Sequence, residues 1–353
     1  MTRNYTLGNG NLLVCLDKDS FIRDLYFPYV GQENHVSGLK HKFGFWADGQ
    51  LYWFDSDAWD KTLKYKKETL VTDVTASNNK LELQVFLNDC VHYEKDIFLR
   101  KIIVKNTSSK KKSIKIFCHQ VFQIAGDNFA NTVYYNPKSD SINFYKGRRY
   151  FLINGLRCNH EKRSFTNYAT GIFNDRGLES TAVDAQDGKL SHNPIAHGSV
   201  DATVSFDFEL DPGAEQTVYY WICVGKKNGT VTRLNKHVFD VGPQNLIDQT
   251  EQHWVKWVNK AKFNFFGLNE DLVQLFKRSL LIVNTHVDKR GAFIASSDSS
   301  MLHLRRDTYA YMWPRDGALI ARSLDRASYN NLTEKFFEFC CKAITEDGYL
   351  FHK

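Results

Sequence analysis

The segment YAYMWPRDGA, residues 309–318, puts three aromatic rings beside one cation and one anion. A sugar ring carries hydroxyl groups around its rim and C–H groups on its faces, so a protein that binds it needs flat aromatic surfaces together with polar groups that make several hydrogen bonds. Arg315 supplies a planar fork of donors, and Asp316 accepts from two hydroxyls at once. With Tyr309 and Trp313 as aromatic walls, these residue types predict a binding site for one hexose.

A simpler interpretation also fits this segment. Pro314 suits the first turn of a helix, where its missing N–H group is not needed. Asp316 would lie in the same turn, where a carboxylate interacts favourably with the helix dipole by about 0.3–1 kcal/mol. Arg315 would pair with Asp316, and the aromatic residues would belong to the core. The sequence alone leaves both interpretations open, although a binding site explains more of the composition.

Other chemistries find less support in the sequence. The GNG at 8–10 precedes a strand-like run and not a helix, so it predicts a turn and not a phosphate-binding loop. No Gly-x-Ser-x-Gly motif occurs, and the twelve histidines never stand four residues apart, so we expect no nucleophile elbow, no metal and no cofactor. Asp298 and Asp307, on the polar loop before the segment, are expected to be solvated or to cap a helix.

The composition, 42% apolar and 24% charged residues, is that of an ordinary globular protein. A chain of 353 residues exceeds the size at which one hydrophobic core stops growing, so two domains are expected. The formal net charge of +6 is a mild excess. Its densest run, Lys110–Lys112, has no interleaved aromatic residues and lies between two strand-like segments, which predicts a solvated hairpin tip. Neither nucleic acid nor a membrane is therefore expected as a partner.

The cysteines and the hydropathy pattern bear on the cellular compartment. The seven cysteines are an odd number without a Cys-x-x-Cys pair, so no disulfide framework is expected. The start of the sequence lacks the apolar run of a signal peptide, and no stretch of 18 apolar residues occurs. We expect a cytoplasmic protein. The sequence does not indicate its oligomeric state.

Up to about residue 240, the pattern is that of β-strands. Apolar and polar residues alternate in several runs without an intervening helical period. The clearest runs are 81–89, 99–106, 113–122, 201–210 and 215–225. Such a series predicts antiparallel sheets packed face to face in a large sandwich.

The period then changes to that of helices. A connector helix is expected over 243–261, capped by Asn245, and further helices are expected after Asn269, from Pro314 to about Arg326, and over 333–344. The expected domains are a β-sandwich over 1–242, a helical linker over 243–268, and the first helices of an α-helical domain over 269–353.

These residues together resemble a known family. The segment at 309–318 is similar to the signature that opens the catalytic barrel of the glucoamylase-like glycoside hydrolases of family 15. In the same order, residues 7–35 resemble the opening of the β-sandwich domain of prokaryotic members, 291–300 the stretch before the signature, and 347–353 a stretch shortly after it. The resemblance implies a β-supersandwich, a helical linker and an (α/α)6 barrel, of which 269–353 would be the beginning. Family members release glucose from the non-reducing ends of α-glucans with inversion.

The resemblance also implies roles for individual residues. Arg315 and Asp316 match the pair that binds the hydroxyls of the terminal glucose in subsite −1. Tyr309 and Trp313 match aromatic residues that line this subsite, whereas Tyr311 matches a packing position. The implied substrate is an α-glucan or a maltooligosaccharide.

The resemblance implies no catalytic residue within this chain. Inverting hydrolysis needs a general acid and a general base whose carboxyl groups stand roughly 6.5–9.5 Å apart. In family 15 both are glutamates well downstream of the signature, and Glu346 follows it too soon to match either. The chain therefore resembles the N-terminal portion of a longer enzyme. We expect it to be inactive alone and to expose apolar barrel helices, with Leu324 and Phe336 among the exposed residues.

Three alternatives remain open at this point. Within the family, a trehalase or a dextran-directed exo-hydrolase would differ from a glucoamylase in parts that this sequence does not contain. A non-catalytic carbohydrate-binding scaffold would use the sandwich with a short helical tail. An enzyme of another (α/α)6 family would require Asp298, Asp307 or Asp316 to be catalytic.

Overall fold

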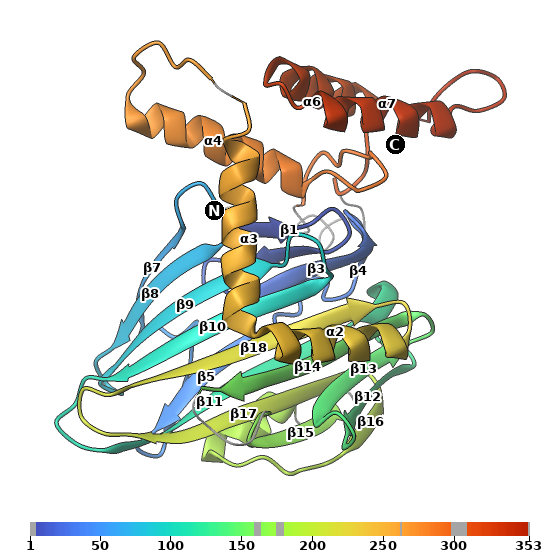
Figure 1. The fold of residues 1–353 in the computed structure, drawn as a ribbon. Helices are drawn as coiled ribbons and strands as arrows, with labels where there is room; N and C mark the ends of the chain where they lie inside the picture. Colours follow the sequence, from blue (N-terminus) through green and yellow to red (C-terminus); the bar gives the residue numbers. More distant parts are fainter. Residues whose placement is uncertain (1–4, 159–163, 174–179, 262, 298–308, 352–353) are drawn as a thin grey trace.

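The computed structural model describes residues 5–158, 164–173, 180–261, 263–297 and 309–351. Figure 1 shows β-sheets at one end of the molecule and a layer of helices at the other. In the described part of the chain, all pairs of neighbouring strands are antiparallel. Antiparallel sheets followed by helices confirm the fold class predicted from the sequence at this level.

Within these described ranges, the strands form three sheets of nine, five and four strands. In spatial order, the nine are β16 (Ile195–Gly198), β12 (Asn131–Asn136), β13 (Ser141–Lys146), β14 (Arg149–Arg157), β18 (Glu215–Gly225), β10 (Ile97–Asn106), β9 (Leu83–Val91), β8 (Thr72–Asn78) and β7 (Asp60–Tyr65). The five are β15 (Asn167–Ile172), β17 (Val200–Leu210), β11 (Lys112–Phe122), β5 (Lys42–Ala47) and β6 (Gln50–Trp53). The four are β1 (Tyr5–Gly8), β2 (Leu13–Leu16), β3 (Ile22–Tyr29) and β4 (Gln32–Asn34).

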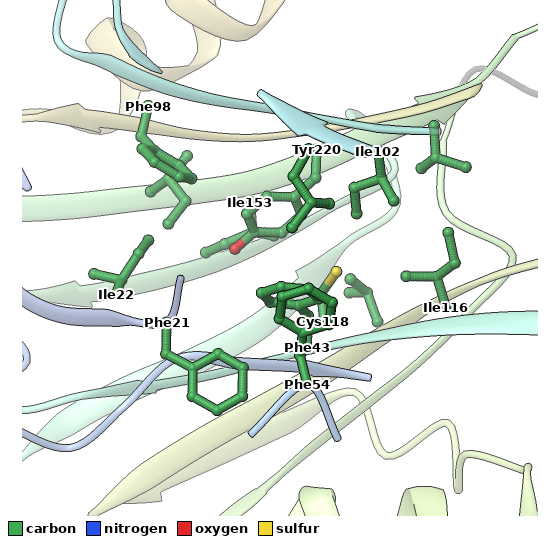
Figure 2. Packing of buried hydrophobic residues seen from close by; sticks show 14 of the residues in the cluster. Phe21, Ile22, Phe43, Phe54, Phe98, Ile102, Ile116, Cys118, Ile153 and Tyr220 are labelled. Atoms are coloured by element: carbon green, nitrogen blue, oxygen red, sulfur yellow. The ribbon is translucent and has the colours of Figure 1, made fainter. Parts of the chain in front are cut away.

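The main hydrophobic core lies between the nine-stranded and the five-stranded sheets. Phe98 and Ile102 of β10 and Tyr220 of β18 contribute from one side, and Ile116 and Cys118 of β11 from the other (Figure 2). None of these side chains is more than 3% exposed. Because successive side chains of a strand point to opposite faces, the alternation in the sequence selects which residues enter this core.

The strand β18 is buried on both faces. Alternate side chains enter the main core, while Trp221 and Cys223 point outwards and pack under helix α2 (Asn228–Val241). Val231 and Val238 of α2 belong to the same cluster, and the indole Nε1 of Trp221 donates to Asn235 Oδ1 over 2.9 Å. The helix therefore covers the outer face of the nine-stranded sheet over β14 and β18.

Helix α3 (Pro243–Val258) connects the sandwich to the helical layer (Figure 1). Its residues Leu246 and Ile247 pack with the sheet, and Trp254 and Val258 pack with the other helices. The remaining elements are α4 (Glu270–Thr285), α6 (Pro314–Arg326), α7 (Asn330–Ala343) and the short α1 (Thr181–Asp184), η1 (Ile124–Gly126) and η2 (Ala185–Asp187). In the described part of the chain, no helix is both long enough and apolar enough to cross a bilayer.

Ring contacts follow α3 from the sandwich to the helical layer. Tyr93, in the turn between β9 and β10, stacks on His253 with centroids 4.3 Å apart. His253 contacts Trp254, Trp254 contacts Trp257, and Trp257 packs on Tyr329 with centroids 4.4 Å apart. Tyr329 lies between α6 and α7, so this series of rings joins the two parts of the molecule.

Two sequence-based expectations about the helices are wrong. The region before residue 240 is not entirely β, because α2 spans Asn228–Val241. Asn245 does not cap the connector helix either: α3 begins at Pro243, after Gly242, and the Asn245 side chain donates to the carbonyl of Val241. Proline at the first helical position needs no partner for a backbone N–H, which explains why the helix begins there.

The expected hairpin over 99–122 is also wrong. The strands β10 and β11 lie in different sheets, so the lysine-rich segment crosses from one sheet to the other. The Lys112 side chain is 5% exposed and forms ion pairs with Asp48 and Glu82. Lys112 is therefore buried at the edge of the sandwich, whereas Lys110 and Lys111 are exposed, as expected for a solvated run.

Buried histidines make the stability of the fold depend on pH. Burial lowers the pKa of His35 to about 4, that of His41 to about 3 and that of His92 to about 4, from an ordinary value of 6.5. His35 and His41 each donate to a backbone carbonyl, of Phe27 and Val121, as expected for neutral rings. Between pH 6.5 and about 4, the unfolded chain therefore binds protons that the folded chain does not.

We predict that the free energy of unfolding falls as the pH is lowered from 7.5 to 5. The lowered pKa of Glu68, about 2, acts in the same direction, but only below its ordinary value of 4.5, because that carboxylate loses its charge in the folded state at still lower pH. Urea denaturation at pH 7.5, 6.5, 5.5 and 5.0 stays above that value and therefore measures the effect of the histidines alone. A constant urea midpoint from pH 7.5 to 5.0 would contradict the assignment of three neutral, buried histidines.

Candidate functional site

The predicted hexose-binding residues lie at the N-terminus of α6. Pro314 occupies the first turn, and the Gly317 N–H donates to the carbonyl of Trp313 over 2.8 Å. Asp316 lies in the same first turn, where the helix dipole favours its negative charge. The backbone of the segment is therefore set by helix geometry, and the side chains of Arg315 and Asp316 extend from a fixed turn.

Arg315 and Asp316 form an exposed ion pair. The Arg315 Nη2 and Asp316 Oδ2 atoms are 3.2 Å apart, and the two side chains are 79% and 38% exposed. An exposed pair of this kind contributes little to stability, because water screens it and its side chains lose freedom. Pairing alone is thus a weak reason for these residues, and their remaining donors and acceptors are accessible to a ligand.

The two predicted aromatic walls lie together on the same segment. The rings of Tyr309 and Trp313 have centroids 6.1 Å apart and planes inclined by 36°, and Tyr309 is 47% exposed. Tyr311 is partly buried, and its carbonyl accepts from the N–H of Ala295 over 3.0 Å. The structure thus places Arg315 beside Asp316 in the first turn of α6, and Tyr309 beside Trp313 in the segment that leads into this helix.

The sandwich and the residues around Ile294 hold this segment in place. Ile294 forms an antiparallel bridge with Met312, two residues before α6 begins. Ile294 and Ala310 also share a buried cluster with Tyr26 of β3 and Val30 of the β3–β4 turn. At Gly31, in the β3–β4 turn, a Cβ atom would lie 2.6 Å from the Ala310 carbonyl, so only glycine permits this close approach.

Helix α7 fixes α6 from the other side. A Cβ atom on Gly317 would lie 2.5 Å from the Phe336 ring, so the absence of a side chain lets the two helices approach closely. Phe336 also stacks on Phe293 with centroids 4.9 Å apart and planes inclined by 20°. The turn that carries Arg315 and Asp316 is therefore held by packing at Gly317, one residue further on.

Leu324 and Phe336 were expected to be exposed, but the structure buries both. Each is 1% exposed and belongs to the buried cluster of the helical layer. The reason is that α6 and α7 pack on each other, so that part of their apolar surface is already covered. Other apolar side chains of the layer are exposed, among them Leu275 at 61%, Leu319 at 60% and Phe337 at 55%.

An apolar groove lies between α4 and α6. Its volume is about 360 Å³, and its lining includes Phe276, Val283, Leu319 and Leu324. Ser279 and Ser323 are the only polar residues of this lining. A surface of this kind suits apolar contacts and offers few of the hydrogen bonds that a sugar requires.

Several other sequence-based hypotheses concern this region. Asp298 and Asp307 lie outside the described residues. Within the described residues, no three His, Cys, Asp or Glu side chains gather in a way that could hold a metal ion. The sequence reasoning missed Asp288, a 2% exposed carboxylate that joins the sandwich to the segment before the site. Asp288 belongs to no local motif, and its partner is 258 residues away in the sequence.

No family model matches the chain. It is 25% identical over 348 residues to an uncharacterized glycosyl hydrolase of Methanocaldococcus jannaschii, a match that covers 97% of this chain and 53% of the relative. The fold of this chain matches that of a bacterial glucoamylase complexed with acarbose, with a TM-score of 0.77 and 16% identity. The match covers 98% of this chain and 50% of the glucoamylase chain. These two proteins are glycoside hydrolases. The chain spans about half the length of each, and the structural likeness shows the shared fold of that half.

We predict that Gly317→Ala lowers the free energy of unfolding by about 1–3 kcal/mol, because the added methyl group meets a ring that is itself locked in a stack. Gly229→Ala, in α2, is the matched control: a Cβ atom there meets nothing within 4 Å, so the better helix propensity of alanine should leave stability equal or higher. Urea denaturation of both variants measures the difference. Equal stability changes would contradict the close packing at Gly317.

Proposed function

We propose that this chain forms the β-sandwich and first barrel helices of an inverting, exo-acting α-glucosidase of the glucoamylase-like family 15. The observation that carries this proposal is the exposed Arg315–Asp316 pair on a fixed helix turn beside Tyr309 and Trp313. The likeness in fold to a bacterial glucoamylase and the sequence match to a glycosyl hydrolase support it. The proposed division is a sandwich over 1–242, a linker over 243–268 and the start of an (α/α)6 barrel over 269–353.

In this proposal, the site holds the terminal glucose of an α-glucan. The Arg315 guanidinium donates to ring hydroxyls, and the Asp316 carboxylate accepts from others. Tyr309 and Trp313 offer their faces to the C–H groups of the sugar. Hydrogen bonds to charged groups contribute about 1.5–3 kcal/mol each, enough for this turn to select one sugar orientation.

The proposed chemistry divides between two parts of the longer relatives. The acid and base carboxyl groups of an inverting enzyme must flank the scissile bond. The resemblance assigns them to glutamates in the half of the relatives that this chain does not span. The residues described here would therefore bind and orient the sugar, and proton transfer would belong to the other half. This chemistry needs no cofactor.

We predict that the protein binds acarbose and that Asp316→Asn weakens binding by tenfold or more, because the amide loses one charged acceptor. Asp325→Asn, on the exposed face of the same helix, is the matched control and should leave the affinity unchanged. Isothermal titration calorimetry measures all three proteins. Equal affinities of the Asp316 and Asp325 variants would remove Asp316 from the site.

A comparison of two ligands tests the enzyme class. Acarbose has a flattened terminal ring, so a catalytic subsite should bind it at least tenfold more tightly than maltotriose, whereas a carbohydrate-binding scaffold should bind both alike.

Glucose release from maltooligosaccharides, trehalose and dextran tests the proposed division of the chemistry between the two halves of the longer relatives. We expect no release by the 353-residue chain alone, and measurable release would contradict the proposed division of the chemistry.

A further inference from the structure

A buried carboxylate joins the sandwich to the segment before the site. Asp288 Oδ2 accepts from the Val30 N–H in the β3–β4 turn over 3.0 Å. Asp288 Oδ1 accepts from the backbone N–H and the Nε of Arg290, over 2.9 and 2.8 Å. The Arg290 guanidinium in turn lies over the Tyr29 ring, 3.5 Å from its centroid. The carboxylate therefore makes three hydrogen bonds, two to its own loop and one to the sandwich.

Asp288 also closes a small hairpin, residues 286–295. Its N–H donates to the Ala292 carbonyl over 2.9 Å, and its carbonyl accepts from the Gly291 N–H over 2.8 Å. Val287 and Phe293 form the antiparallel bridge of this hairpin. The hairpin meets the sandwich at Asp288, whose carboxylate accepts from Val30, at Lys289, whose N–H donates to the Gly10 carbonyl over 2.9 Å, and at Ile294, which packs with Tyr26. Among these contacts, Asp288 supplies the side-chain hydrogen bond.

The other edge of the hairpin holds the site. Ile294 is bridged to Met312, and the Ala295 N–H donates to the Tyr311 carbonyl. Pro314 and the Arg315–Asp316 turn follow directly in the chain. A shift of the hairpin would be transmitted to this turn through backbone hydrogen bonds, which permit little sliding.

We propose that Asp288 is a positioning residue: by anchoring the 286–295 hairpin on the β3–β4 turn, it holds the segment 309–316 in the geometry that binds the sugar. The sandwich then has a role in the site although none of its side chains belongs to it. The effect on sugar affinity rests on the proposed function, whereas the effect on the order of the segment does not.

Glu68 provides a matched control for this proposal. Like Asp288, it joins the sandwich to the helical layer, but its carboxylate accepts from Lys277 and Gln274 of α4 and from Asn259. None of these three partners forms a backbone hydrogen bond with the segment 309–316, as Ala295 does with Tyr311. Removing Glu68 therefore tests whether any lost contact between the two parts has the same effect.

The first measurement is hydrogen exchange by mass spectrometry on peptides covering 309–321 and on peptides covering β10 and β18. Asp288→Ala should speed exchange in 309–321 by tenfold or more and leave β10 and β18 unchanged. Asp288→Asn keeps an acceptor for Val30 but loses the charge that Arg290 contacts, so its effect should be intermediate. Glu68→Ala should leave 309–321 unchanged.

The second measurement is acarbose affinity, which should fall tenfold or more in Asp288→Ala and stay unchanged in Glu68→Ala. If wild type does not bind acarbose but the exchange pattern appears, the proposed function fails and the positioning role stands. Unchanged exchange in 309–321, or faster exchange in all peptides alike, would overturn the positioning role. If Asp288→Ala does not fold, Asp288→Asn decides by the same criteria.

Discussion

The burial of both faces of β18 is the constraint from which the rest of the architecture follows. The inner face packs in the main core, and the outer face would leave Trp221 and Cys223 in water without a cover. Helix α2 supplies this cover, and α3 continues from it across the sheet. Because α3 leaves the sandwich with Trp254 and Val258 still to be buried, α4, α6 and α7 pack against its far end. The position of the helical layer thus follows from the packing of α2 and α3 on the outer face of the sheet.

Two opposed requirements meet at the start of α6. The turn must be rigid, and this comes from apolar contacts: Ala310 against the four-stranded sheet and Gly317 against Phe336. The side chains that the turn presents are charged and exposed, and they add little to stability. Packing therefore fixes the backbone of the site while leaving its hydrogen-bonding groups to solvent or to a ligand, an arrangement suited to a polar molecule such as a sugar.

Local patterns account for most of what could be predicted from the sequence. Strand alternation predicts the sheets, and the proline after Trp313 predicts the start of α6, where the helix begins. The binding roles of the four candidate residues stay predictions. The helix α2 was missed because its sequence is rich in β-branched residues and begins with Asn228 and Gly229, so that packing under the sheet and not intrinsic propensity makes it helical. Leu324 was expected to be exposed because the resemblance suggested a larger barrel, whereas α6 buries it against its neighbours. The contact between Asp288 and Val30 has no local signal at all.

The series of rings along α3 has a mechanical consequence. Helix α3 is held by ring contacts at both ends, Tyr93 on His253 and Trp257 on Tyr329, and these contacts oppose bending of the helix relative to either part of the molecule. Sandwich and helical layer should then tumble and respond to force as one rigid body, without the clamshell closure by which many two-domain proteins enclose their ligands.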